Sequence, residues 1–133
     1  MTPEYITPIQ EGVPNIQILY GGEFTGDTIG HWICTYYDGN ILHIYDSLNY
    51  GKINYQSHNT YLQALYPFNP RKIFHKVQQQ PNLTDCGVFA IAFAVSIYFK
   101  ENPENQIYDV KKMRRHLWGI LQRNTLELFP TTN

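Results

Sequence analysis

The sequence of 133 residues is poor in cysteine and in charge, and it has no long hydrophobic segment. Its two cysteines are too few for a disulfide framework, and its N-terminus lacks the basic and apolar regions of a signal peptide. The longest apolar run, at residues 87–99, is shorter than the ~18 residues that a membrane span needs. These absences predict an intracellular protein without a membrane span.

Positive charge is scarce as well. Ten Lys and Arg residues against eleven Asp and Glu residues give a net charge of −1, and the first 51 residues contain no Lys or Arg. A chain without excess positive charge has no general attraction for polyanions, so we expect no nucleic-acid partner. A late basic cluster is interpreted as the solvated face of a helix, with nucleic-acid contact as the alternative: Lys111, Lys112, Arg114 and Arg115.

The spacing of a metal site is also missing. Four of the five histidines are scattered along the chain without the intervals of zinc ligands: His43, His58, His75 and His116. We therefore expect no metal and no cofactor.

Apolar residues are plentiful, because hydrophobic types make up 43% and aromatic types 15% of the chain, enough for one domain with a core. Three prolines predict an irregular arm over residues 1–15, followed by a compact domain over residues 16–133. Strands are predicted at residues 16–20, 31–37, 40–46 and 72–77, with a polar loop over residues 21–30. Helices are predicted at residues 57–66, from about residue 86, and at residues 107–122. This order indicates an α+β fold in which helices pack on a mostly antiparallel sheet.

The dipeptide Asp38-Gly39 between two strand patterns is typical of a two-residue type I′ hairpin turn. In that register Tyr37 faces Asn40, and His31 lies directly opposite Asp46. A carboxylate that faces an imidazole can hold its tautomer and orientation, as in the base half of a catalytic triad. The alternative is a polar cross-strand pair at the end of a sheet.

Cys86 is expected in the first turn of the apolar helix, with Asp85 as the N-cap. Free backbone N–H groups and the positive end of the helix dipole favour a thiolate at that position. The dipole contributes only about 0.3–1 kcal/mol, less than one pKa unit represents, so an imidazolium neighbour would have to supply most of the activation. The alternative is a small core residue, which is also our interpretation of Cys34 in the middle of a strand.

Gln80 lies in a turn-rich segment six residues before Cys86. A side-chain amide beside a helix N-terminus can join the backbone N–H of Cys86 in an oxyanion hole. The alternative is an ordinary loop glutamine, because Gln78 and Gln79 stand next to it.

Three short motifs follow one another along the chain: Gly30-His31-Trp32, Tyr45-Asp46-Ser47-Leu48 and Gln80-x-Asn82-x-x-Asp85-Cys86-Gly87-Val88-Phe89. Together they resemble the motifs of the ubiquitin-like-protein-specific cysteine proteases, the SUMO-protease branch that is related to adenovirus-type proteases. The resemblance covers roughly residues 16–121 in the order His, Asp, Gln, Cys of that family. It implies a papain-like, adenovirus-protease-like core with the nucleophile at the N-terminus of a buried apolar helix.

Carried over by position, the resemblance implies that Cys86 is the nucleophile, His31 the general base and Asp46 the carboxylate that orients it. Gln80 would donate to the oxyanion, and Trp32 would cover a narrow passage for a Gly-Gly C-terminus. The adenovirus-type branch often has Glu where this chain has Asp46, which favours the SUMO-protease branch.

The resemblance implies a thiol isopeptidase that cleaves after the C-terminal Gly-Gly of a ubiquitin-like modifier, SUMO first, with ubiquitin or NEDD8 as alternatives. Its partner would be that modifier or its conjugates, met in the cytoplasm or nucleus, or in a host cell if the chain is an effector. Two other functions stay open: polyprotein processing for a virus or mobile element, and a non-catalytic module that binds a ubiquitin-like tail. Family catalytic domains are usually longer, which leaves open that the chain is part of a larger polypeptide.

Overall fold

The computed structural model describes residues 6–22, 30–48, 51, 53 and 56–132. The strands are β1 (Asn15–Gly21), β2 (His31–Tyr37), β3 (Ile41–Tyr45) and β4 (Arg71–His75). The helices are α1 (Gln56–Leu65), α2 (Cys86–Tyr98) and α3 (Val110–Arg123), with a short 3-10 helix, η1, at Pro103–Asn105. Every predicted strand and helix is present near its expected bounds, whereas η1 has no counterpart in the prediction. The loop predicted over residues 21–30 lies mostly outside the described residues.

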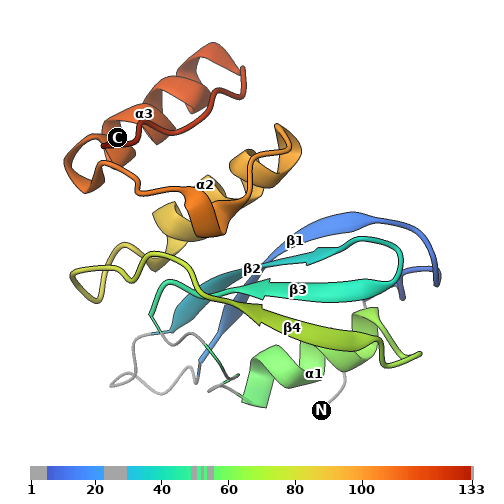
Figure 1. Ribbon diagram of the computed structural model, residues 1–133. Coiled ribbons are helices and arrows are strands. Elements are labelled where there is room, and N and C mark those ends of the chain that lie inside the picture. Colours follow the sequence, from blue (N-terminus) through green and yellow to red (C-terminus); the bar gives the residue numbers. More distant parts are fainter. Residues whose placement is uncertain (1–5, 23–29, 49–50, 52, 54–55, 133) are drawn as a thin grey trace.

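The four strands form one sheet in the order β1-β2-β3-β4 (Figure 1). β1, β2 and β3 are antiparallel neighbours, whereas β4 runs parallel to β3. A parallel pair needs a crossover, and α1 supplies it between β3 and β4. The prediction of an α+β fold with a mostly antiparallel sheet is confirmed.

Helices cover both faces of the sheet. In Figure 1, α1 lies under one face and α2 over the other, with α3 beyond α2. Alternate residues of β2 enter the two cores: Ile33 and Tyr37 pack with Leu62 of α1, whereas Cys34 packs with Phe89 of α2. α2 is apolar all round because it lies between the sheet and α3. Among the described helices, none combines the length and the apolar character that a membrane crossing requires.

The hairpin between β2 and β3 differs in register from the predicted one. Tyr37 pairs with Leu42 and not with Asn40. The prediction that His31 lies directly opposite Asp46 is therefore wrong, because the register is displaced by two residues. A displacement by two leaves every side chain on its predicted face, so the two groups still approach each other diagonally.

The turn itself explains the displacement. The Asp38 N–H donates to the Ile41 carbonyl at 3.1 Å, which makes Gly39-Asn40 the two central residues. Gly39 takes the required positive φ of +99°. The Asp38 carboxylate accepts hydrogen bonds from the N–H groups of Asn40 and Ile41, at 2.8 and 2.7 Å, and so closes the turn from outside.

Asp85 stands at the N-cap position of α2, as predicted, but its side chain makes no capping hydrogen bond. Its carboxylate accepts instead from Asn82 Nδ2 at 2.7 Å and from Arg114 Nε at 2.9 Å. The predicted side-chain cap is therefore wrong, because the side chains of Asn82 and Arg114 bind the carboxylate instead.

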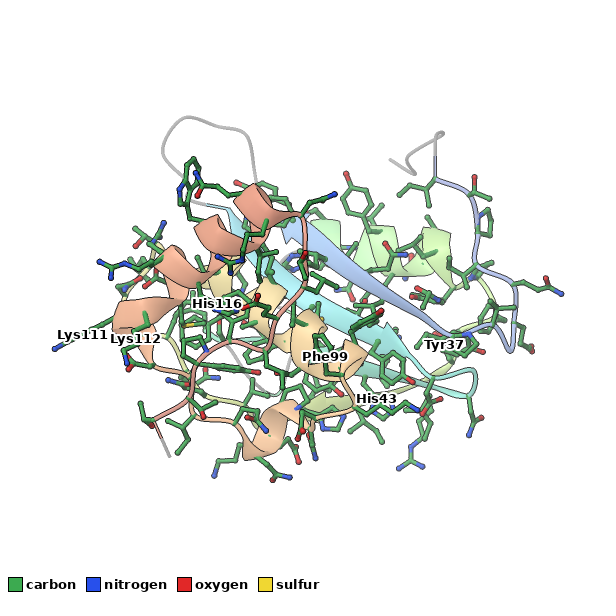
Figure 2. The ribbon with its side chains drawn as sticks, turned by 90° about the horizontal axis from the view of Figure 1, so that it is seen from above. Tyr37, His43, Phe99, Lys111, Lys112 and His116 are labelled. Atoms are coloured by element: carbon green, nitrogen blue, oxygen red, sulfur yellow. The ribbon has the colours of Figure 1, made fainter. Side chains whose placement is uncertain are left out.

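The basic residues of α3 do not form one uniform surface. Figure 2 shows Lys111 and Lys112 at one end of α3, pointing away from the rest of the molecule. Arg115 is exposed as well, in keeping with a solvated helix face. Lys112 pairs at 3.8 Å with Asp109, next to the start of its own helix, whereas Arg114 reaches away from α3 to Asp85, with which it forms an ion pair at 2.6 Å.

Candidate active site

His31 and Asp46 come from neighbouring strand ends, since His31 begins β2 and Asp46 directly follows β3. His31 Nε2 donates to Asp46 Oδ1 at 2.6 Å, and both side chains are buried. The same oxygen accepts from the Leu48 N–H at 2.9 Å, which fixes the carboxylate. Because Asp46 takes Nε2, Nδ1 is the ring nitrogen that can serve a thiol.

Cys86 is the first residue of α2, and its thiol lies near enough to the His31 imidazole for each group to shift the pKa of the other. Burial raises the pKa of the Cys86 thiol, but hydrogen bonds from His31 and from the N–H groups of Trp32 and Gly87 lower that pKa by more. Burial lowers the pKa of His31, but hydrogen bonds with Asp46 and Cys86 raise it to about 9. Both changes favour a thiolate beside an imidazolium.

Cys34 has the opposite environment. It lies in the middle of β2 and is 0% exposed. Burial raises the pKa of its thiol far above the ordinary value, so Cys34 stays protonated and unreactive. This agrees with its interpretation as a core residue.

Gln80 lies in the loop between β4 and α2 and is buried. Its Oε1 accepts from the Ser47 hydroxyl, and its backbone N–H donates to the Ser47 carbonyl at 2.6 Å. Its Nε2 donates to the Asn82 carbonyl at 2.7 Å. Gln80 therefore links the residue after Asp46 to the segment that leads into Cys86.

The two neighbouring glutamines are engaged elsewhere. Gln78 exchanges hydrogen bonds with the backbone of Tyr108, at 3.2 and 2.7 Å. Gln79 donates to the Asp46 carbonyl at 3.0 Å and to the Val77 carbonyl at 3.1 Å. These bonds join the loop before α2 to the backbone of Tyr108 and to that of Asp46.

A groove of about 600 Å³ opens beside Cys86. Trp32 lies along it, 39% exposed, with its ring centroid 4.9 Å from that of Tyr20. A Cβ atom on Gly87 would lie 3.5 Å from the Trp32 indole, so the indole sits close above the start of α2. Most of the lining is apolar: Ile18, Tyr20, Leu83, Val88, Ile91 and Leu117. Cys86 therefore borders a groove with a largely apolar lining.

His58 holds the backbone of His31 and was not singled out by the sequence. It is buried in α1, and its Nε2 donates to the His31 carbonyl at 3.0 Å. A Cβ atom on Gly21 would lie 2.4 Å from His58 Nε2, so this packing requires glycine there. Arg114, which binds Asp85, was likewise assigned only to a solvated face. Neither residue has a local signal, because 27 and 29 positions separate the bonded partners.

A thiol at a helix N-terminus, joined to an imidazole that a buried carboxylate orients, is the arrangement that defines the cysteine proteases. The comparison with known families agrees with this class. The chain belongs to the Ulp1 protease family, whose C-terminal catalytic domain matches residues 31–122. No curated protein matches the chain by sequence.

Among solved structures, the fold is similar to the C-terminal Ulp1 protease domain in complex with Smt3, the yeast ortholog of SUMO. The TM-score is 0.58 at 18% sequence identity, and the alignment covers 86% of this chain and 54% of that one. The chain therefore spans about half the length of the protease domain that it resembles. The likeness confirms the predicted protease core.

Proposed function

We propose that this chain is a cysteine protease that cleaves after the C-terminal Gly-Gly of a ubiquitin-like modifier, with SUMO as the first candidate. The observation that carries the proposal is the placement of the Cys86 thiol, at the start of α2, beside an imidazole that Asp46 orients. The similarity to a domain bound to Smt3 supports a modifier of the SUMO type. Residues 16–133 would form the catalytic domain, and residues 1–15 an irregular arm.

In the proposed reaction, the Cys86 thiolate attacks the glycyl carbonyl carbon, and the carbonyl oxygen becomes an oxyanion. Gln80 and the Cys86 N–H would stabilise that oxyanion. The imidazolium of His31 gives its proton to the leaving amine as the C–N bond breaks, which leaves a thioester. His31 then accepts a proton from water, whose oxygen attacks the thioester; the C–S bond breaks, the Cys86 thiolate leaves, and the new carboxylic acid of the modifier loses its proton to the solvent. Asp46 keeps the ring oriented throughout.

The groove supports glycine at the cleavage site. Trp32 lies close to Gly87, directly beside the nucleophile, and Gly30 lines the same groove. A chain that lies along the groove beside the indole, Gly30 and Gly87 would meet the crowded side of the groove next to the scissile bond, which favours residues without side chains there. The apolar lining further along the groove would hold the rest of the tail.

A panel of propargyl probes made from SUMO, ubiquitin and NEDD8 tests the proposal. We expect the SUMO probe to label the wild-type protein and the matched control Cys34→Ser, and to leave Cys86→Ala unlabelled. Labelling that persists in Cys86→Ala would refute the assignment of the nucleophile. Binding of a modifier without cleavage of its conjugates would show a non-catalytic module, and cleavage of viral polyprotein junctions alone would show the adenovirus-type activity. The first result would overturn the proposed activity, and the second would overturn the proposed substrate.

A further inference from the structure

Arg114 reaches from α3 to the residue that precedes the proposed nucleophile. Its Nε and Nη2 atoms lie 2.9 and 2.6 Å from Asp85 Oδ1, and Nη2 also donates to the Thr84 carbonyl at 3.0 Å. Asp85 directly precedes Cys86, and Arg114 lines the same groove as the thiol. One side chain thus fixes both the backbone and the carboxylate at the entrance to α2.

This contact is the outer end of a hydrogen-bonded network. Asp85 Oδ2 accepts from Asn82 Nδ2 at 2.7 Å, while Asn82 Oδ1 accepts from the N–H groups of Thr84 and Asp85 at 2.9 and 3.0 Å. The Asn82 carbonyl accepts from Gln80 Nε2 at 2.7 Å, and Gln80 in turn bonds Ser47. The network therefore runs from α3 through the loop to the neighbour of the Asp46 carboxylate.

The two charges in this contact act in opposite senses on the ionisation of Cys86. The Asp85 side chain is only 12% exposed, so its negative charge is poorly hydrated. A negative charge next to a thiol opposes the formation of a thiolate, and it would also oppose an oxyanion on the substrate. The guanidinium of Arg114 offsets that charge. Since the Arg114 side chain is 64% exposed, salt weakens its effect.

We propose that Arg114 is a positioning residue of the active site, which holds the loop before α2 and offsets the negative charge of Asp85 beside Cys86. Arg114 acts through Asp85 and Thr84, and not by contact with the reacting atoms. The inference rests on the proposed function only in taking Cys86 as the nucleophile.

The test measures the ionisation of Cys86 without any substrate. In a Cys34→Ser background, the rate of alkylation by iodoacetamide is followed against pH for the parent, Arg114→Met and Arg114→Met/Asp85→Asn. We expect Arg114→Met to move the ionisation to higher pH, so that alkylation at the parent midpoint slows about 2- to 5-fold. Removal of the Asp85 charge in the double variant should return the midpoint toward the parent. Arg115→Met, one position along the same helix, is the matched control and should leave it unchanged.

A structural role alone would not give this pattern, because a second substitution in a damaged loop would not restore the ionisation. The inference is refuted if Arg114→Met and Arg115→Met behave alike, or if Asp85→Asn fails to restore the midpoint. Should Arg114→Met not fold, Arg114→Lys keeps the charge and loses the fork of two nitrogens. Arg114→Lys should keep the midpoint of Cys86 ionisation at the parent pH at low salt. A shift as large as the one expected for complete loss of the positive charge would refute the proposal.

The same variants separate this inference from the proposed function. With the favoured modifier conjugate, Arg114→Met should lower kcat about 3- to 10-fold with little change in KM. If Cys86→Ala keeps full turnover, the proposed function fails, whatever Arg114 does. If Cys86 is essential and neither kcat nor the thiol ionisation responds to Arg114→Met, only the inference about Arg114 fails.

Discussion

Replacement of Asp46 by Asn removes the negative charge of the carboxylate and keeps the oxygen to which His31 and Leu48 bind. Asn has the same shape, and its Oδ1 atom can still accept from His31 Nε2 and from the Leu48 N–H, which now lie 2.6 and 2.9 Å from that oxygen. The variant therefore tests the charge of the carboxylate separately from its geometry. Because both side chains are buried, little water is present to screen the change.

The magnitude follows from the pKa of His31. Burial alone would lower that pKa, but Asp46 and Cys86 raise it from 6.5 to about 9. At about 1.4 kcal/mol for each tenfold change in proton affinity, the difference corresponds to at most about 3 kcal/mol. Between pH 6.5 and about pH 9, His31 keeps its proton in the folded state and loses it in the unfolded state. This stabilisation is therefore fully present below about pH 6.5 and disappears as the pH rises through about 9.

Two assays measure the effect. Urea unfolding at pH 6 should show a loss of up to about 3 kcal/mol in Asp46→Asn, and the loss should shrink at pH 9 and above. The thiolate–imidazolium pair exists only below the pKa of His31, so the alkaline limb of kcat/KM should fall from about 9 to lower pH in the variant. We expect kcat to drop by about 10²- to 10⁴-fold at neutral pH, the usual contribution of general acid–base catalysis.

Asp38→Asn is the matched control. Asp38 also accepts from a histidine, His43 Nε2 at 2.8 Å, but it lies at the turn of the hairpin, at the opposite end of β2 from His31. The Asp38→Asn substitution should leave kcat and the alkaline limb of kcat/KM unchanged. If Asp46→Asn keeps an alkaline limb near 9, or loses no more activity than Asp38→Asn, the charge of Asp46 does not set the state of His31 and the reasoning is refuted.

Two further predictions concern the supports of the site. Gly21→Ala should lower both the stability and kcat, because the new Cβ would lie 2.4 Å from His58 Nε2 and displace the ring that holds the His31 carbonyl. Thermal unfolding and turnover measure the two effects, and unchanged values for both would contradict the prediction. Tyr108→Phe should cost about 1 kcal/mol, because it removes the buried hydrogen bond of 2.7 Å to Ser96; urea unfolding that shows no loss would mean that this bond adds nothing to stability.

The hairpin shows how far local patterns reach. The interpretation of Cys34 as a core residue in the middle of a strand is confirmed, because it is buried in β2 against α2. The turn chemistry predicted Asp38-Gly39 as the central residues of the turn, whereas the structure has Gly39-Asn40 there. The choice depends on the Asp38 side chain, which accepts from two N–H groups and so excludes Asp38 from the centre of the turn. Such a bond is local, but the pattern Asp-Gly is compatible both with Asp at the centre of a turn and with Asp just before it.

The sequence alone determined the order of the elements, the apolar helix that begins at Cys86 and the motifs that resemble a protease family. These depend on periodicity, on turn residues and on short runs of side chains, all of which act within a few positions. Only the tertiary structure decided that Asp85 binds Arg114 and does not cap α2, and that His58 holds the His31 carbonyl. Those contacts join residues that lie 27 and 29 positions apart. They form only when the helices pack on the sheet, and patterns that act within a few positions do not predict them.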